Sequence, residues 1–449
     1  MSRMIRGWAR VLGLVAALLA GERTAAAQMA WQSWGVLPFS AVDIAVVEAG
    51  GRYVMYFTKY AGDPRPGRAF SSDLRTWTVD DRDFCLTSGD LCSPDALSAL
   101  GHRPIIRLND GRFRLFRKFG DQVQSFVSTD AITWTRDPGS RLTRDSSLVW
   151  ERGARFITGL ALLRLPDGRI RLYYSGVVVP GSEGTPPEYT NCGGCMGILS
   201  AISNDDGLTF VREPGVRVDP KVLGPSTSQG SFHAIGHSIL PLDDGGYRLY
   251  TTSWSDGAVT YFSPDGLTFS LEGQIPAIGS DIATRRLDDG RVWLVSSVPG
   301  TVRHAEGCPQ GCDNSAADLM YEVSHVMVYG PASFNVASVL WNRAERAATL
   351  TVEGAFTEPV TLNPIQARSA CATTPDHPWC PWHPEYYAVT PATPGNPSIR
   401  IAYTGPSQRP DFTRDQQMYF EAVSGDQKIV TQVSCMISLA SGTTPFCTN

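Results

Sequence analysis

One stretch of sequence decides the fold of this chain. It reads Leu163-Arg164-Leu165-Pro166-Asp167-Gly168-Arg169-Ile170-Arg171-Leu172-Tyr173-Tyr174. An Asp-Gly pair between two alternating apolar runs is a strong signal of a β-hairpin, and the type I′ turn that joins such strands needs two residues that tolerate positive φ. The stretch therefore predicts two antiparallel strands joined by a tight type I′ turn.

The same hairpin pattern returns four more times, at residues 44–57, 105–116, 240–250 and 284–294. A second motif, Ser-x-Asp-x-x-Thr-aromatic, follows at residues 71–77 and 128–134 and, slightly varied, at 205–210 and 263–269. Its aspartates are Asp73, Asp130, Asp206 and Asp265. We expect each of them to accept hydrogen bonds from neighbouring backbone N–H groups within a turn, which is a structural role.

Units of two hairpins that repeat along a chain are typical of the four-stranded blades of a β-propeller. Five copies of the first hairpin predict an all-β, five-bladed β-propeller over residues 28–330. The fifth unit, at about residues 278–329, lacks the second motif, so residues 31–39 are the expected closing strand. Beyond residue 330 the repeat fades, and strand-like runs at 348–352, 399–403 and 429–433 predict a smaller C-terminal β appendage over residues 331–449.

The composition agrees with a turn-rich all-β protein. The chain has 449 residues, of which 18% are charged, 10% are aromatic, 43 are Gly and 31 are Pro. This pattern favours strands and turns over helices. The formal net charge is −5, which argues against a nucleic-acid partner because phosphate binding needs a basic surface.

Residues 1–27 have the pattern of a secretory signal peptide. Arginines at positions 3, 6 and 10 precede an apolar run over residues 11–20, and three alanines at 25–27 offer a cleavage site. The apolar run is shorter than the roughly 20 residues that span a bilayer. We therefore expect a secreted or periplasmic protein with no membrane span.

Ten cysteines fall into five close pairs: Cys85 with Cys92, Cys192 with Cys195, Cys308 with Cys312, Cys371 with Cys380, and Cys435 with Cys447. An exported chain is expected to oxidise them to disulfides. The alternative is a metal site at the Cys-x-x-Cys of Cys192 and Cys195, but a lone pair of this kind is weak evidence for zinc. Pairing of neighbours is the simplest arrangement, and the sequence leaves the connectivity open.

Residues 167–176 and 200–210 resemble the five-bladed propeller superfamily of arabinanases, levansucrases and invertases. The resemblance extends over roughly residues 31–330. The Ser-x-Asp motif is also similar to the Asp-box turns of sialidases. Both groups cleave glycosidic bonds, so the resemblance implies a carbohydrate substrate and an arabinanase-like or invertase-like glycoside hydrolase.

The innermost strand of each blade lines the channel of a propeller, and in this chain it precedes the Gly-rich hairpin. Counting back from the turn reaches Asp43 in the first repeat, His102 and Arg103 in the second, residues 158–160 in the third, His237 in the fourth and Asp281 in the fifth. Polar residues at four of these five positions predict a site in the channel. The alternative is a channel plugged by its own hydrogen bonds, with no ligand.

Hydrolysis of a glycoside usually needs two carboxyl groups, one on each side of the scissile bond. The resemblance implies that Asp43 is the catalytic base or nucleophile. These families place a second aspartate in blade three and a glutamate in blade four, where this chain has Thr158 and His237. Asp281 is the predicted partner carboxylate, and Asp95 and Glu151 are alternatives that would reach in from loops.

Four other residues are predicted to bind substrate: His102, Arg103, His237 and Trp254. No cofactor is expected, although His237 together with His102 or His233 offers ligands for a channel metal ion. The alternative to an enzyme is a non-catalytic propeller that binds a glycan or a protein. The missing blade-four glutamate favours it, as do the insertions at 177–197 and 303–319, each with a cysteine pair that would stiffen a recognition loop.

Overall fold

The structure is a computed structural model. It describes residues 28–39, 41–59, 65–80, 88–92, 104–153, 159–179, 181–189, 195–219, 235–243, 245–253, 257–275, 281–297, 324–342, 347–364, 387–404, 416–436 and 446–448. The predicted signal peptide lies outside these ranges. Across them the protein is all-β, since its only helices are two short 3₁₀ turns, η1 (Asp90–Cys92) and η2 (Pro187–Tyr189). Neither these turns nor any other part of the described chain forms an apolar helix of membrane-spanning length.

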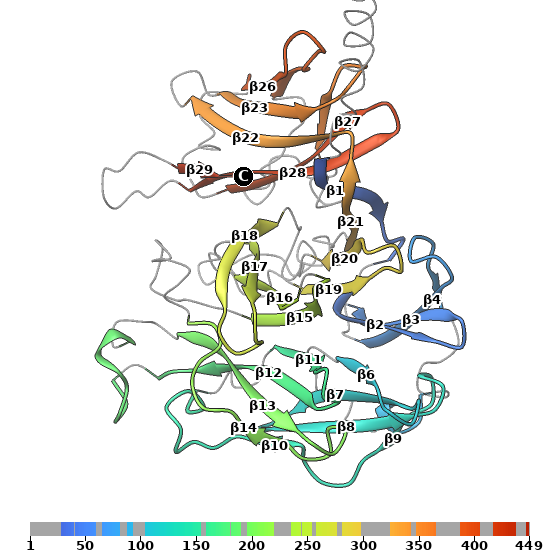
Figure 1. The fold of residues 1–449 in the computed structure, drawn as a ribbon, viewed down its shortest axis with the longest axis vertical. Helices are drawn as coiled ribbons and strands as arrows, with labels where there is room; N and C mark the ends of the chain where they lie inside the picture. The colour runs from blue at the N-terminus through green and yellow to red at the C-terminus, as the bar shows by residue number, and fades with distance from the viewer. Residues whose placement is uncertain are drawn as a thin grey trace, which may run out of the picture.

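Each predicted hairpin forms the first two strands of an antiparallel sheet (Figure 1). The first sheet contains β2 (Val42–Ala49), β3 (Arg52–Lys59), β4 (Arg65–Ser71) and β5 (Thr78–Val79). The second contains β6 (Ile105–Arg107), β7 (Phe113–Phe119), β8 (Gln122–Ser128), β9 (Thr135–Arg136) and β10 (Leu142–Thr143). The third contains β11 (Leu160–Arg164), β12 (Ile170–Val177), β13 (Met196–Ser203) and β14 (Val211–Arg212), and the fourth β15 (Ile235–Pro241), β16 (Tyr247–Ser253), β17 (Gly257–Ser263) and β18 (Ser270–Ile275).

The hairpin turns differ from the type I′ prediction in the stretch that decides the fold. The N–H of Gly168 donates to the carbonyl of Leu165, and the N–H of Leu165 donates to the carbonyl of Arg169, which encloses a three-residue loop. In this loop Gly168 alone has positive φ, at 87°, because a turn followed by one left-handed residue needs positive φ only there. In the first hairpin Ala49 pairs with Arg52, and the two loop residues between them, Gly50 and Gly51, both have positive φ, which is the pattern of type I′.

A fifth sheet begins with β19 (Asp281–Arg286), β20 (Val292–Ser297) and β21 (Ser324–Ala332). As the repeats predicted, the segment before the first hairpin adds the next strand: β1 (Gln28–Val36) pairs with β21 along its length. The same sheet continues through β28 (Gln427–Met436), β27 (Gln416–Ser424) and β24 (Thr361–Pro364), with β29 (Phe446–Thr448) also paired to β28. Strand β1 thus joins the fifth repeat to the C-terminal part.

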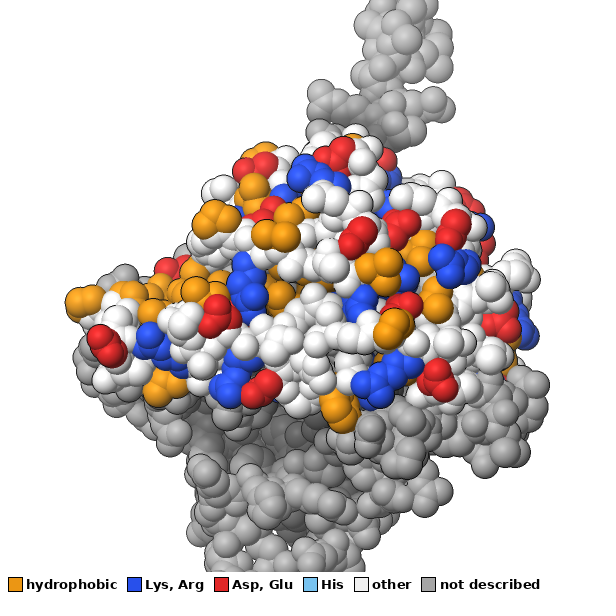
Figure 2. All heavy atoms as spheres, turned by 90° about the horizontal axis from the view of Figure 1, so that it is seen from below, with side chains coloured by type: hydrophobic (Ala, Val, Ile, Leu, Met, Phe, Trp, Pro, Cys, Tyr) orange, Lys and Arg blue, Asp and Glu red, His pale blue; other side chains and the backbone are white. Residues whose placement is uncertain are grey.

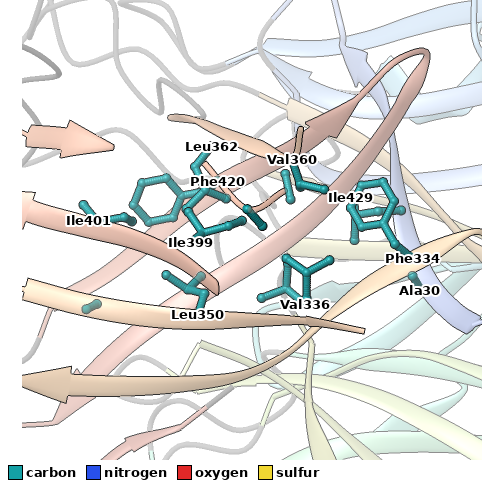
Figure 3. Packing of buried hydrophobic residues seen from close by; sticks show 14 of the residues in the cluster. Ala30, Phe334, Val336, Leu350, Val360, Leu362, Ile399, Ile401, Phe420 and Ile429 are labelled. Carbon is teal, nitrogen blue, oxygen red and sulfur yellow. The ribbon is translucent and has the colours of Figure 1, made fainter. Parts of the chain in front are cut away.

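The C-terminal part buries its core between two sheets. The second of these contains β22 (Phe334–Asn342), β23 (Ala347–Gly354), β26 (Ser398–Tyr403) and β25 (Tyr387–Thr390). Phe334, Leu350, Ile399, Phe420 and Ile429 meet in this core with no more than trace exposure (Figure 3). The predicted boundary at residue 330 falls within β21, so the chain passes from one part to the other along a continuous strand.

The first strands of successive sheets lie beside one another. Strand β11 contacts β15, β15 contacts β19, β19 contacts β2, and β2 contacts β6. Side chains connect two of these pairs of neighbouring strands. Between β15 and β19 the hydroxyl oxygens of Ser238 and Thr284 lie 2.6 Å apart, and between β19 and β2 Arg285 forms an ion pair with Glu48. The sequence order of the repeats is therefore also their order in space.

The Ser-x-Asp motifs form turns, called Ser-Asp turns below, at residues 71–77, 128–134, 203–210 and 263–269. In the last of them Asp265 Oδ1 accepts hydrogen bonds from the N–H groups of Leu267 and Thr268, both at 2.8 Å. The third turn corrects the sequence interpretation, because Asp205 and not Asp206 accepts from the N–H of Thr209, at 2.9 Å. Asp206 instead takes the left-handed position, with φ of 56°.

Candidate functional site

Asp43 lies near the start of β2 in a strained backbone conformation. Its φ is 52°, which is uncommon for a residue other than glycine and costs about 1–3 kcal/mol. The pairing of β2 with β3 shifts between Val42 and Ala45, so Asp43 lies in a bulge. Bulges redirect side chains and are frequent next to active sites.

The carboxylate of Asp43 has a partner on the next strand. The hydroxyl of Thr58, which is fully buried on β3, donates to Asp43 Oδ2 at 3.2 Å. Asp43 itself is half-buried. Sequence analysis missed Thr58, although a signal existed: Thr58, Ser175 and Ser297 follow the turn arginines Arg52, Arg169 and Arg291 at the same distance.

The backbone of Asp281 lies at the same end of the neighbouring strand. Asp281 is the first residue of β19, and its partner on β20 is Ser297. The Arg285–Glu48 ion pair lies further along both β19 and β2, so the later parts of the two strands lie beside each other. Asp43 and Asp281 therefore both stand at the starts of adjacent first strands.

His237 lies on β15, the other neighbour of β19. Gly236 pairs with Thr251 and Ser238 with Tyr250, so the pairing shifts across His237. Ser238, the next residue, contacts Thr284 of β19. The structure thus brings the backbones of three predicted site residues, Asp43, Asp281 and His237, to three adjacent strands.

Three other predicted site residues, His102, Arg103 and Trp254, lie outside the described residues, and so do Asp95, Thr158 and His233. Their predicted roles remain predictions.

Glu151, an alternative second carboxylate, is committed to an ion pair. It is fully buried, and Arg212 donates to both of its oxygens at 2.7 Å. The Tyr174 hydroxyl donates to Oε1 at 2.9 Å and the Asp145 N–H to Oε2 at 2.8 Å. Burial, together with this carboxylate, raises the pKa of Tyr174. These partners occupy the carboxylate of Glu151, so we retain Asp281 as the predicted partner of Asp43.

Two cysteine pairs reach into the described chain. Cys195 is buried and disulfide-bonded, while its expected partner Cys192 lies outside the described residues. Cys435 on β28 stands directly opposite Cys447 on β29, as a bond between neighbours in sequence would require. The described residues contain no group of three His, Cys, Asp or Glu side chains that could hold a metal ion.

Charges of both signs are interspersed on the face below the second and third sheets, without a large area of one sign (Figure 2). Elsewhere in the described chain, exposed charges pair within hairpin turns, such as Arg112 with Asp110 and Arg169 with Asp167, each at 2.7 Å. Such exposed pairs contribute little stability.

No protein-family model and no curated protein matches this chain. Among solved structures, it is similar to a family 117 glycoside hydrolase from the marine bacterium Zobellia galactanivorans, with 15% identity and a TM-score of 0.46 over 71% of this chain and 96% of that chain. It is also similar to the family 32 β-fructofuranosidase of Bombyx mori, with 11% identity and a TM-score of 0.45 over 92% of this chain and 89% of that chain. A third similar structure is the endo-arabinase of Bacteroides thetaiotaomicron, with 14% identity and a TM-score of 0.42 over 67% of this chain and 96% of that chain. Since each TM-score is below one half, we infer nothing about this chain's activity from these likenesses.

Proposed function

We propose that this chain is a secreted glycoside hydrolase whose first five sheets are the blades of a β-propeller. The glycan binds at the starts of the first strands, which line the channel, with Asp43 as base or nucleophile. The support for five blades is the order of the sheets, whose first strands contact one another in the sequence order of the repeats.

The observation that carries the proposal is the geometry of Asp43. A carboxylate in a bulge, at positive φ, is costly to maintain, and strain of this kind clusters at functional sites. The Thr58 hydroxyl donates a hydrogen bond to Oδ2 and so helps to orient the carboxylate. An ionised carboxylate is the form needed for a base or a nucleophile.

In this proposal Asp281 supplies the second carboxyl group from β19. Retaining glycosidases hold their two carboxyl groups about 5–5.5 Å apart and inverting ones about 6.5–9.5 Å apart. Adjacent first strands that start at the same end are compatible with either range. His237 on β15 then stands beside the acid as a substrate-binding group.

The test is reducing-sugar release from arabinans, fructans, xylans and sialosides by the mature protein and its Asp43→Asn and Asp281→Asn variants. We expect release by the wild type and a loss of about 10²-fold or more in each variant, with unchanged melting temperatures. Asp167→Asn, in an exposed hairpin turn, is the matched control and should keep full activity. Absence of release from every polymer would reject the enzyme and favour a glycan-binding propeller.

A further inference from the structure

Side chains of the third sheet donate hydrogen bonds to the Ser-Asp turn of the fourth sheet. Arg171 on β12 donates through Nε and Nη2 to the carboxylate of Glu213, at 2.7 and 2.8 Å. Its Nη1 donates to the backbone carbonyl of Asp265, at 3.2 Å. The hydroxyl of Tyr173 donates to the carbonyl of Gly266, at 2.7 Å. An Arg–acid pair and a tyrosine thus bind two carbonyl oxygens of the next sheet's turn.

Earlier sheets repeat this contact. In the second sheet Arg114 pairs with Asp137, at 3.0 Å, and donates to the carbonyl of Asp206 in the third sheet's turn. In the first sheet the Tyr56 hydroxyl donates to the carbonyl of Ala131, at 2.7 Å, in the turn of the second. Three successive junctions therefore use a buried Arg or Tyr on the second strand to hold carbonyl oxygens of the next turn.

The fourth sheet keeps these groups, but within the described residues they contact no Ser-Asp turn. Arg248 occupies the position of Arg171 and donates to Glu272, with Nε 2.6 Å from Oε2, and Tyr250 occupies the position of Tyr173. In the fifth sheet, β21 ends at Ala332, and after Ser333 the chain continues into β22, where the third strands of the other sheets lead into a Ser-Asp turn.

A cavity of about 490 Å³ lies where that turn would be. Arg248, Tyr250 and Glu272 line one side of it, and Trp31 and Tyr329 line another with ring centroids 5.1 Å apart. The remaining walls come from β1, β17, β18, β22 and β28. The volume is within the range of about 300–1,000 Å³ found for small-molecule sites.

We propose that this cavity binds a neutral sugar unit, at a site separate from Asp43. At the other junctions the arginine and tyrosine equivalent to Arg248 and Tyr250 donate to acceptor oxygens, and sugar hydroxyls supply such oxygens. The opposite charges of Arg248 and Glu272 cancel. The pair therefore offers donors and acceptors to vicinal hydroxyls without favouring a charged ligand. Trp31 and Tyr329 add the aromatic surface on which the apolar face of a sugar ring packs.

Two observations support this choice of ligand. Burial raises the pKa of Tyr250 to about 12, so its hydroxyl remains a donor at every physiological pH. The cavity lies between the outer strands of the fourth sheet and the C-terminal part, whereas Asp43 lies on the first strand of the first sheet. The site would hold a glycan on the protein while a different segment occupies the channel.

A cavity-filling substitution tests this site. A Cβ added at Gly273, in the cavity wall, meets no heavy atom within 4 Å, so Gly273→Phe adds a ring at the cavity wall without a clash at its Cβ. Gly395→Phe is the matched control, since Gly395 is equally open and lies outside the cavity lining. Arg248→Gln is a second variant that removes the guanidinium from a partly exposed pair.

The measurement is affinity electrophoresis of the full mature chain through gels that contain arabinan, levan or xylan, in the Asp43→Asn background to prevent hydrolysis. We expect retardation by at least one polymer, with binding weakened about tenfold or more by Gly273→Phe and by Arg248→Gln but not by Gly395→Phe. Equal retardation of all variants, or retardation by none of the polymers, would overturn the proposal. Reducing-sugar release by the Gly273→Phe protein with Asp43 intact reports on the channel site separately.

Discussion

The ring nitrogen Nε2 of His325 lies 2.9 Å from the hydroxyl oxygen of Ser33, which connects β21 to β1. The Ser33 hydroxyl donates its proton to Glu421 on β27, so the ring must donate its Nε2–H to Ser33. Nδ1 is then unprotonated, and it has no hydrogen-bond partner in the described part of the chain. His325 is 1% exposed, and burial lowers its pKa to about 4.

The free energy of unfolding should therefore fall when the pH is lowered from the pKa of an unfolded histidine to the pKa of the buried His325. An unfolded histidine titrates near pH 6.5, so between about pH 6.5 and 4 the unfolded chain binds a proton that the folded chain refuses. The contribution of His325 to the free energy of unfolding is therefore complete above about pH 6.5. It declines by roughly 3 kcal/mol toward pH 4 and is constant below that pH. Urea unfolding across this range should show a shallower decline for His325→Gln, and parallel profiles would contradict the assignment.

Loss of Arg212 should destabilise the fold far more than loss of an exposed arginine. Arg212→Ala leaves the fully buried carboxylate of Glu151 without its counter-charge, at a cost of about 3–5 kcal/mol. Arg112→Ala removes an exposed partner of Asp110 and should cost at most about 1 kcal/mol. Chemical denaturation of the two variants makes the comparison, and equal losses would show that the Glu151 pair contributes no more than a surface pair.

Because the backbone at Asp43 is left-handed, the stability of variants at this position should depend on the shape of the new side chain. Asn tolerates positive φ, so Asp43→Asn should keep the melting temperature. Asp43→Val places a β-branched residue in the same conformation and should cost about 1–2 kcal/mol or more. Unfolding of the two variants in denaturant checks this order, and equal stability would mean that the bulge relaxes.

The contact between the third and fourth sheets should be sensitive to one added methyl group. A Cβ at Gly266 would meet Arg171 Nη1 at 2.7 Å and the Tyr173 hydroxyl oxygen at 2.9 Å. Gly111, also at positive φ, has open space around it, so Gly111→Ala carries only the conformational cost of about 1–2 kcal/mol. Gly266→Ala should lose about 1–3 kcal/mol more than Gly111→Ala in denaturant unfolding. Equal losses would show that the two side chains move aside freely.

The hairpins could be predicted from sequence because Asp-Gly between apolar runs is a local signal. The turn type could not, since Leu165 N–H bonds to Arg169 across three residues, and only the paired strands fix that loop length. The same limit explains Asp205: the third Ser-Asp turn is one residue longer, which moves the accepting carboxylate by one position. Local spacing does not report such a shift.

The strand positions of Asp43, Asp281 and His237 followed from the repeat, because equivalent positions in repeated units occupy equivalent places. Their partners did not, since these depend on residues from other strands or loops. Thr58 reaches Asp43 from β3, and Arg212 from β14 holds Glu151. The cavity beside Arg248 results from what the fifth sheet lacks, so it becomes visible only when the sheets are placed side by side.

The placement of β1 has a consequence for folding. This strand is the first of the described strands along the chain, yet it pairs with β21 and touches β28, which come much later in the sequence. Until those strands arrive, β1 has an open edge that other chains can join. The fifth sheet therefore closes late, through long-range pairing, and removing β28 would expose the edge of β1 that β28 covers and make it prone to aggregation.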